Sequence, residues 1–157
     1  MSNLPCGCPG SRAQQFEPAA GAADEAPGAR ASQLRQWPVQ LHLVSPAAPY
    51  FKGADVLLSA DCVAYAAGDF HKDFLQGKSL AIACPKLDQG QDIYVEKIKG
   101  LFEDAEINTL TVAIMEVPCC MGLLNMARAA LDASKRKAPL KAVTVSVRGG
   151  VLAEEWF

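Results

Sequence analysis

Short runs of large apolar residues alternate with helix-like segments from Trp37 onward. The runs are rich in Val, Ile, Leu or Thr, and they span residues 39–44, 55–60, 79–83, 108–116 and 141–147. Strands and helices that alternate at this spacing form right-handed β-α-β units, which place helices against the faces of a mainly parallel sheet. The sequence therefore predicts an α/β fold, a three-layer sandwich with a mainly parallel sheet of about five strands.

Three of the segments between these runs are typical of helices. One begins at Asp69 and another at Asp92, and aspartate commonly caps helix N-termini. The third begins at Pro118 or Cys119 and ends before the basic residues 135–137, whose charge suits the negative end of the helix dipole. This order of elements indicates a Rossmann-like or flavodoxin-like domain and leaves the strand order open.

The composition is that of one compact domain. A chain of 157 residues, half of them apolar, can bury one sizeable core. The formal net charge is −2 and the basic residues are scattered, which argues against a nucleic-acid-binding surface. No run approaches about 18 apolar residues, and the N-terminus lacks a signal-peptide pattern. We therefore expect a cytoplasmic protein with no membrane partner.

A stretch without any large apolar side chain divides the chain. Residues 17–32 cannot offset the entropy that is lost on ordering, so we predict a flexible tether there. It would join an N-terminal arm, residues 1–16, to an α/β domain, residues 33–157. The arm carries Cys6 and Cys8, and the tether would allow it to fold back onto the domain.

Four further cysteines follow three of the predicted strands. They are Cys62, Cys84, Cys119 and Cys120, after the runs 55–60, 79–83 and 108–116. Ligands of open α/β sheets bind outside the carboxyl ends of the strands, so we expect these thiols to converge on one edge of the sheet. In a reducing compartment cysteines more often bind metals or catalyse reactions than form disulfides. The pattern therefore favours a metal or iron–sulfur site.

All six cysteines are candidates to bind an iron–sulfur cluster. A [4Fe–4S] cluster is the favoured cofactor, and two smaller centres or one larger cluster stay open as alternatives. We expect the arm to supply a ligand, with Cys8 preferred over Cys6 because Pro9 fixes the backbone that follows. The predicted metal ligands are Cys8, Cys62, Cys84, Cys119 and Cys120.

Residues beside these cysteines suggest further roles. Cys119 and Cys120 open a helix, whose backbone N–H groups and dipole favour a thiolate over a thiol. Gly122, one turn later, is expected to leave room for a bulky inorganic group. Asp61 and Glu116 lie close to strand-end cysteines and are candidates to tune a reduction potential or to ligate a metal through oxygen, although loop or capping carboxylates are commoner.

Three other interpretations stay open. Free cysteines are often ordinary core residues, and the pair Cys119 and Cys120 is compatible with a strained vicinal disulfide. Zinc sites usually show two C-x₂₋₄-C pairs, whereas this chain has only C-x-C and C-C. The alternative functions are therefore a zinc or other metal-binding carrier module and a metal-free thiol–disulfide protein. Neither an enzymatic activity nor an oligomeric state is predicted.

Six short strings occur together and carry a family resemblance. They are Cys6-Gly-Cys-Pro-Gly-Ser11, Leu34-Arg-Gln-Trp-Pro-Val-Gln-Leu41, Pro49-Tyr-Phe-Lys-Gly-Ala-Asp55, Ala60-Asp-Cys-Val63, Cys84-Pro-Lys-Leu-Asp88 and Met115-Glu-Val-Pro-Cys-Cys120. With them the chain resembles the poorly characterised cysteine-rich domain that follows a two-cluster [4Fe–4S] ferredoxin module in proteins of anaerobic bacteria and archaea. The resemblance implies an iron–sulfur redox protein, active in electron transfer or a cluster-centred redox reaction. The ferredoxin run Cys-x₂-Cys-x₂-Cys-x₃-Cys does not occur here, so a separate ferredoxin or reductase is the expected electron partner.

Overall fold

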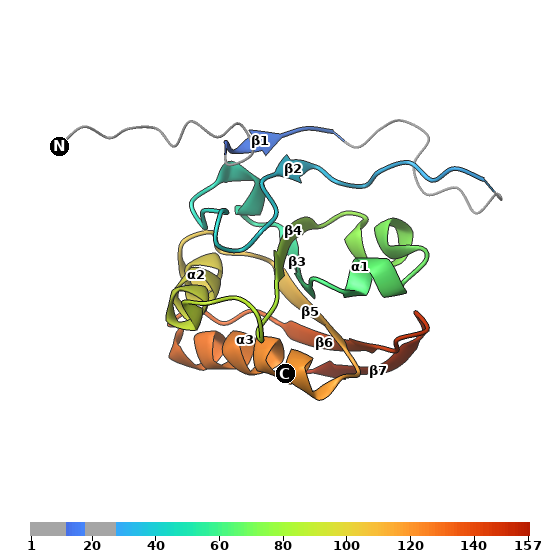
Figure 1. Cartoon of the computed structure of the whole chain (residues 1–157). Helices are drawn as coiled ribbons and strands as arrows, with labels where there is room; N and C mark the ends of the chain where they lie inside the picture. Colours follow the sequence, from blue (N-terminus) through green and yellow to red (C-terminus); the bar gives the residue numbers. More distant parts are fainter. Residues whose placement is uncertain (1–11, 18–27) are drawn as a thin grey trace.

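A five-stranded sheet forms the centre of the computed structural model, which describes residues 12–17 and 28–157 (Figure 1). Its strands are β3 (Asp55–Ala60), β4 (Ser79–Ala83), β5 (Thr109–Met115), β6 (Leu140–Val145) and β7 (Val151–Trp156). They lie side by side in the order β4-β3-β5-β6-β7, and only β7 runs antiparallel to its neighbour. The predicted α/β fold with a mainly parallel sheet is confirmed.

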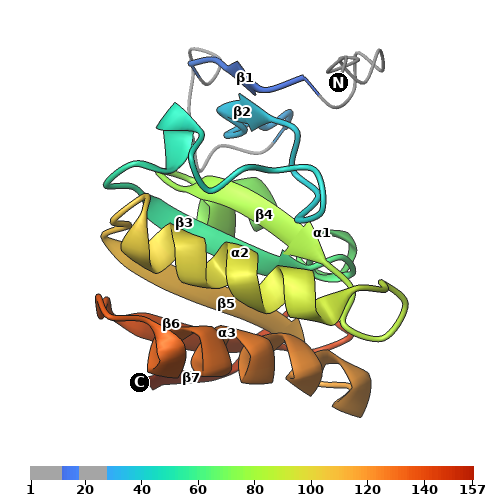
Figure 2. The ribbon, with the colours of Figure 1, turned by 90° about the vertical axis from the view of Figure 1, so that its left-hand side faces the viewer.

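Helices cover both faces of this sheet. The short helix α1 (Val63–Ala66) and the π-helix η3 (His71–Leu75) connect β3 to β4 on one face. On the other face, α2 (Gln91–Glu103) and α3 (Met121–Ala133) pack against each other (Figures 1 and 2). After β4 the chain returns across β3 to β5, so right-handed crossovers place the later helices on the opposite face. Within the described residues, no helix is long and apolar enough to cross a membrane.

The central strands are buried on both faces, as parallel strands between two helical layers must be. Val56, Leu57 and Leu58 follow one another in β3 and are all fully buried. From α2, Tyr94 and Ile98 enter the same core, one turn apart on one helix face. Continuous apolar runs in the sequence therefore became central strands, which explains why β3, β4, β5 and β6 were predicted close to their observed bounds.

One predicted strand is wrong, and one strand of the five-stranded sheet was missed. In the segment 39–44, Gln40 alone forms a bridge, to Ile82, and a turn follows. The missed strand is β7, every residue of which is exposed. Without a buried face, β7 lacks the apolar pattern that identifies strands in a sequence.

The helix starts also differ from the prediction. Gly90 occupies the N-cap of α2 with a φ of 71°, a left-handed conformation that suits glycine, and Asp92 lies in the first turn. Phe70 rather than Asp69 precedes η3. The Asp69 carboxylate instead forms an ion pair with Arg30, in which Asp69 Oδ1 lies 3.4 Å from Arg30 Nε.

A short ladder joins the end of the predicted arm to the start of the predicted domain. Strand β1 (Gln14–Gln15) pairs antiparallel with β2 (Gln36–Trp37). The Phe16 N–H donates to the Arg35 carbonyl at 2.8 Å, which extends the pairing by one residue. Cys6, Cys8 and most of the predicted tether lie outside the described residues.

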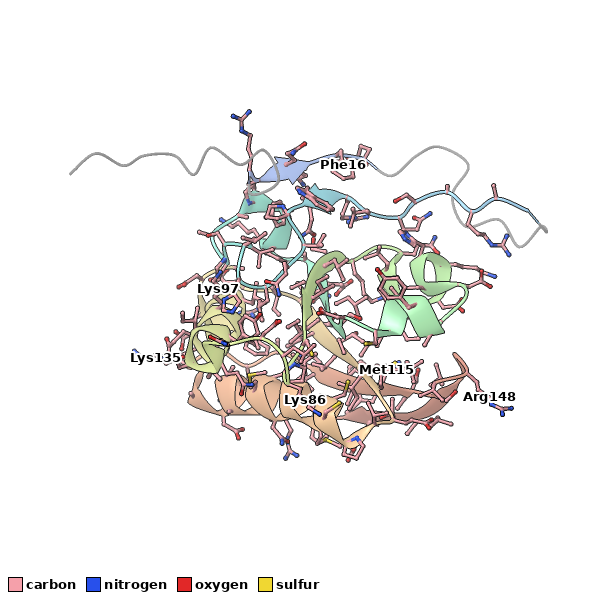
Figure 3. The ribbon with its side chains drawn as sticks, viewed as in Figure 1. Phe16, Lys86, Lys97, Met115, Lys135 and Arg148 are labelled. Atoms are coloured by element: carbon pink, nitrogen blue, oxygen red, sulfur yellow. The ribbon has the colours of Figure 1, made fainter. Side chains whose placement is uncertain are left out.

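Lys97 of α2 holds the turn that replaces the predicted strand (Figure 3). Its ammonium donates to the carbonyls of Leu41, His42 and Val44 at 2.9, 2.7 and 2.9 Å. Burial lowers the pKa of this lysine. The loop therefore depends on one cation for three of its carbonyl groups.

Replacing Lys97 with methionine should lower the free energy of unfolding by about 2 kcal/mol, because three carbonyls lose a charged donor while the aliphatic stem is kept. Urea denaturation measures the change. Lys99→Met, two residues along α2, is the matched control and should change stability by less than about 0.5 kcal/mol. Equal effects of the two substitutions would show that the three carbonyl contacts add nothing.

Candidate cofactor site

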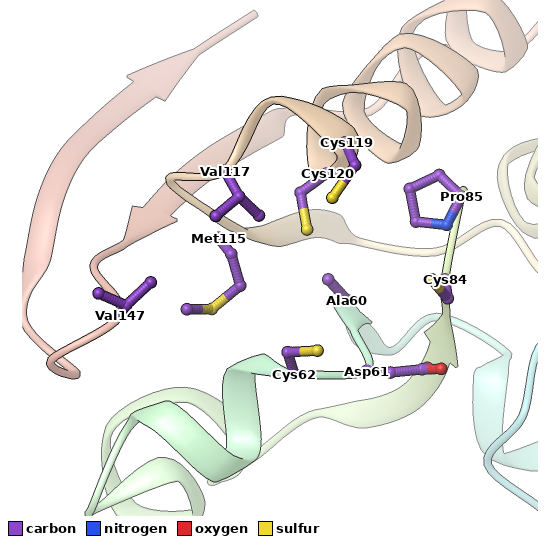
Figure 4. A pocket seen from close by; sticks show the side chains of 10 residues that line it. All are labelled: Ala60, Asp61, Cys62, Cys84, Pro85, Met115, Val117, Cys119, Cys120 and Val147. Atoms are coloured by element: carbon purple, nitrogen blue, oxygen red, sulfur yellow. The ribbon is translucent and has the colours of Figure 1, made fainter. Parts of the chain in front are cut away.

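Four free thiols line one cavity of about 210 Å³ at the carboxyl edge of the sheet (Figure 4). They belong to Cys62, Cys84, Cys119 and Cys120. In Figure 4, Cys119 and Cys120 face Cys62 across this space, which we call the thiol cavity. From β3 the chain goes to β4 on one side, and then crosses back over β3 to β5 on the other side. The cavity therefore lies at the point where the strand order reverses. Ligands of open α/β sheets bind at such points.

The rest of the wall is almost entirely apolar. It consists of Ala60, Pro85, Met115, Val117 and Val147, with Asp61 as the one carboxylate. Val147 comes from the β6–β7 turn and Met115 from the end of β5, so neighbouring loops close the cavity from several sides. Such a wall leaves the thiols as its main ligating groups.

The end of β3 places Cys62. The Asp61 N–H donates to the Ala83 carbonyl at 3.1 Å, which carries the β3–β4 pairing one residue beyond the strand. Cys62 is then the N-cap residue of α1, and its carbonyl accepts from the N–H groups of Tyr65 and Ala66, both at 3.2 Å. Its exposed side chain is thereby fixed at the rim of the thiol cavity.

A tight turn after β4 places Cys84. Its carbonyl accepts from the Asp88 N–H at 3.0 Å, and its own N–H donates to the Asp88 carboxylate, also at 3.0 Å. The Leu87 N–H donates to the Cys84 sulfur at 3.4 Å. Hydrogen bonds to sulfur stabilise its anionic form and are one of the factors that set cluster potentials.

Asp88 ties this turn to α2. Besides the Cys84 N–H, its Oδ2 accepts from the Tyr94 hydroxyl and from Gln40 Nε2, the latter at 3.1 Å. Burial opposes ionisation, but these hydrogen bonds outweigh it and lower the pKa of Asp88. Sequence reasoning missed Asp88, although a carboxylate four residues after Cys84 is a recognisable turn signal.

The two adjacent cysteines differ in their surroundings. Both lie in the short 3-10 helix η4 (Pro118–Cys120), which runs directly into α3. Cys120 is only 6 % exposed and its N–H donates to the Val117 carbonyl at 3.1 Å, whereas Cys119 is exposed. Burial, with smaller effects of the neighbouring Cys119 and Cys62, raises the pKa of Cys120. At Cys120, burial therefore opposes the expected preference of a helix start for thiolate.

The space beside Gly122 is filled by protein, so the predicted room for an inorganic group is wrong there. A Cβ at this position would lie 3.1 Å from the Cβ of Pro85. Gly122 instead allows the turn after Cys84 to approach the start of α3 closely. This contact brings Cys84 to the same cavity as the thiols of η4.

The two candidate carboxylates have separate positions. Glu116 is exposed and does not line the thiol cavity. Asp61 lines it, and its Oδ1 is buried without a hydrogen-bond partner among the described residues. Burial and, second, the charge of Asp88 raise the pKa of Asp61.

The donor set and the size of the thiol cavity fit a group larger than one ion. Its volume of about 210 Å³ far exceeds the roughly 30 Å³ that a water molecule occupies in the liquid. Sulfur ligands select soft metals and iron–sulfur clusters. Within residues 12–17 and 28–157, no three Cys, His, Asp or Glu side chains are grouped so as to hold a single metal ion. Cys6 and Cys8, the remaining predicted ligands, lie outside the described residues.

Comparisons with known proteins agree with the fold and name no chemistry. Residues 48–156, which include all four thiols of the cavity, match the family model of a Rossmann-like domain. An uncharacterised protein from Archaeoglobus fulgidus is 32% identical over 119 residues, which cover 76% of this chain and 83% of that protein. No solved structure matches.

Proposed function

We propose that this chain, which belongs to the Rossmann-like domain family, binds an iron–sulfur cluster at the carboxyl edge of its sheet and acts as a redox protein. The observation that carries this proposal is the meeting of four thiols, from three separate loops, around one otherwise apolar cavity. Those loops follow β3, β4 and β5, so the fold itself brings the thiols together. The role is electron transfer or a cluster-centred redox reaction.

The ligating cysteines would hold the cluster through their thiolates, with a [4Fe–4S] cluster as the favoured form. When bound, the cluster supplies reversible one-electron chemistry. Two groups of the chain lie near the Cys84 ligand. The Leu87 N–H donates to the Cys84 sulfur, and the Asp88 carboxylate, whose pKa is lowered, accepts from the Cys84 N–H in the same turn. Met115 and Val117 contribute apolar side chains to the cavity wall. These groups would orient the ligands and adjust the reduction potential.

Further ligands and partners complete the proposal. Cys8, or failing that Cys6, would reach the thiol cavity from the N-terminal arm. Electrons would be exchanged with a separate ferredoxin or reductase in the cytoplasm of an anaerobe. The rival functions are a zinc or other metal carrier and a metal-free thiol–disulfide protein, and each predicts a different metal and sulfide content.

Anaerobically purified protein should contain iron together with acid-labile sulfide. Cys84→Ser should weaken retention of iron by about tenfold or more, since it removes a ligand whose sulfur is already oriented by the Leu87 N–H. Leu87→Ser is the matched control, because this side chain is 78% exposed and the backbone N–H is kept. Iron and sulfide should stay unchanged in that variant.

The same analysis separates the rivals. Zinc without sulfide would support the carrier function, and absence of both would leave the thiol–disulfide protein. Full iron and sulfide in Cys84→Ser would remove Cys84 from the ligand set and contradict the site proposed here.

A further inference from the structure

A second cavity of about 230 Å³ adjoins the thiol cavity. Ala60 and Asp61 line both cavities, so the end of β3 is their common wall. Leu80 and Ile82 of β4 contribute apolar side chains to it. We call this second space the aromatic cavity, because four of its lining residues carry aromatic rings. They are Trp37, Tyr65, Phe70 and His71.

These rings come from three separate parts of the chain. Trp37 lies in β2, Tyr65 in α1, and Phe70 and His71 at the start of η3. Tyr65 is 93% exposed, an unusual position for a large aromatic side chain in a folded domain. Phe70 and His71 stand edge to face, with centroids 5.9 Å apart. Such walls favour a flat ring, which aromatic side chains hold by stacking or by edge contacts.

The aromatic cavity also has a hydrogen-bond donor. The backbone N–H of Gln33 donates to His71 Nδ1 at 3.0 Å. The neutral imidazole therefore carries its proton on Nε2, because Nδ1 already acts as the acceptor. His71 can thus donate from Nε2 to a carbonyl oxygen of a ligand.

The acceptor comes from the wall that the two cavities share. Asp61 lines the aromatic cavity, and its Oδ1 is buried without a hydrogen-bond partner among the described residues. Asp61 as a whole is only partly buried, so a ligand in the cavity that brings an N–H group can donate to its carboxylate.

We propose that the aromatic cavity binds a planar heteroaromatic lactam, a ring system with a C=O group next to an N–H group. The ring packs against Trp37 and Tyr65, its N–H donates to Asp61, and its C=O accepts from His71. A volume of about 230 Å³ suits one or two fused rings. Binding of the ring does not require the iron–sulfur cluster. The ring and the thiols would lie on opposite sides of the end of β3, which lines both cavities.

Pterin, a fluorescent two-ring lactam, is a direct probe. Titration of the full chain should show saturable binding to one site, seen as a change in pterin fluorescence. Trp37→Leu should weaken this binding at least tenfold, and Tyr65→Ala should weaken it without disturbing the fold, because that side chain is exposed. Trp156→Leu, which changes the other tryptophan, 61% exposed on β7, is the matched control and should bind as the unmodified chain does.

Two further comparisons test the chemistry and the location. A pterin methylated on the lactam nitrogen should bind at least tenfold more weakly, because it cannot donate to Asp61. Cys119→Ser should leave binding unchanged, because Cys119 lines only the thiol cavity. Absence of saturable binding would overturn the inference. Binding lost in Cys119→Ser but kept in both Trp37→Leu and Tyr65→Ala would also overturn it. Iron content is measured separately, so either failure is distinct from failure of the proposed function.

Discussion

Gly149→Ala should lower the free energy of unfolding by about 4 kcal/mol, with about half from backbone strain and half from overpacking. Gly149 has a φ of 93°, a conformation that residues with a Cβ rarely adopt. A Cβ there would lie 2.3 Å from the carbonyl oxygen of Ala66. Because that atom belongs to the backbone at the end of α1, no side-chain rotation relieves the overlap.

The contact has consequences for the site as well as for stability. Gly149 lies in the turn between β6 and β7, which also carries Val147, part of the thiol cavity wall. Ala66 ends the helix that begins after Cys62. Separating the turn from α1 would therefore shift Cys62 and Val147 relative to each other and open the cavity.

Urea denaturation of Gly149→Ala and of Gly150→Ala forms the test. A Cβ on Gly150 would meet only Ser146 Oγ, at 3.9 Å, so this neighbour should change stability by less than about 0.5 kcal/mol. A loss below about 1 kcal/mol in Gly149→Ala would mean that the turn and α1 separate readily and do not position the cavity wall.

The part of this molecule that sequence could predict is the part governed by burial. Helices cover both faces of the sheet, so its inner strands are continuous apolar runs in the sequence. This pattern predicted β3, β4, β5 and β6. β7 is exposed along its whole length, so its sequence has no apolar pattern from which a strand could be predicted. The segment 39–44 is apolar for a different reason, since Leu41 and Val44 are core residues of a turn held by Lys97.

The candidate site was predictable to the same degree. Three strand-end positions for the thiols follow from the rule that ligands bind at the carboxyl edge of parallel strands. Two other features of the site depend on how separate loops pack together. They are the position of Val147 in the cavity wall and the contact between Gly122 and Pro85, and no local sequence pattern predicts either. Asp88 lies between these cases, because its position after Cys84 is local but its partners Gln40 and Tyr94 are not.

Cys119 and Cys120 should give unequal results when each is changed to serine. Neighbouring thiols at one helix start cannot readily ligate the same iron with a relaxed backbone, so the pair must divide its roles. Cys120 is 6 % exposed within the cavity wall, whereas Cys119 is exposed. A buried ligand is protected from exchange with water, and we therefore assign Cys120 as the primary ligand.

Cys120→Ser should accordingly lose most of the iron, with retention weakened by about tenfold or more. Cys119→Ser should keep iron and sulfide but shift the reduction potential, since it changes a thiol that ligates a different iron or stands free at the edge of the cluster. Both variants are purified anaerobically and assayed for iron, acid-labile sulfide and potential. Met121→Ser, the next residue and 49% exposed, controls for serine at this helix start and should alter none of the three.

The possible outcomes distinguish the arrangements of the site. Loss of iron in Cys119→Ser alone would make the exposed thiol the ligand and reverse the assignment. Full retention in both variants would mean that the pair is structural. The cluster would then have to be built from Cys62 and Cys84 together with Cys6 and Cys8, which would make the N-terminal arm indispensable because the remaining edge of the sheet offers only two thiols.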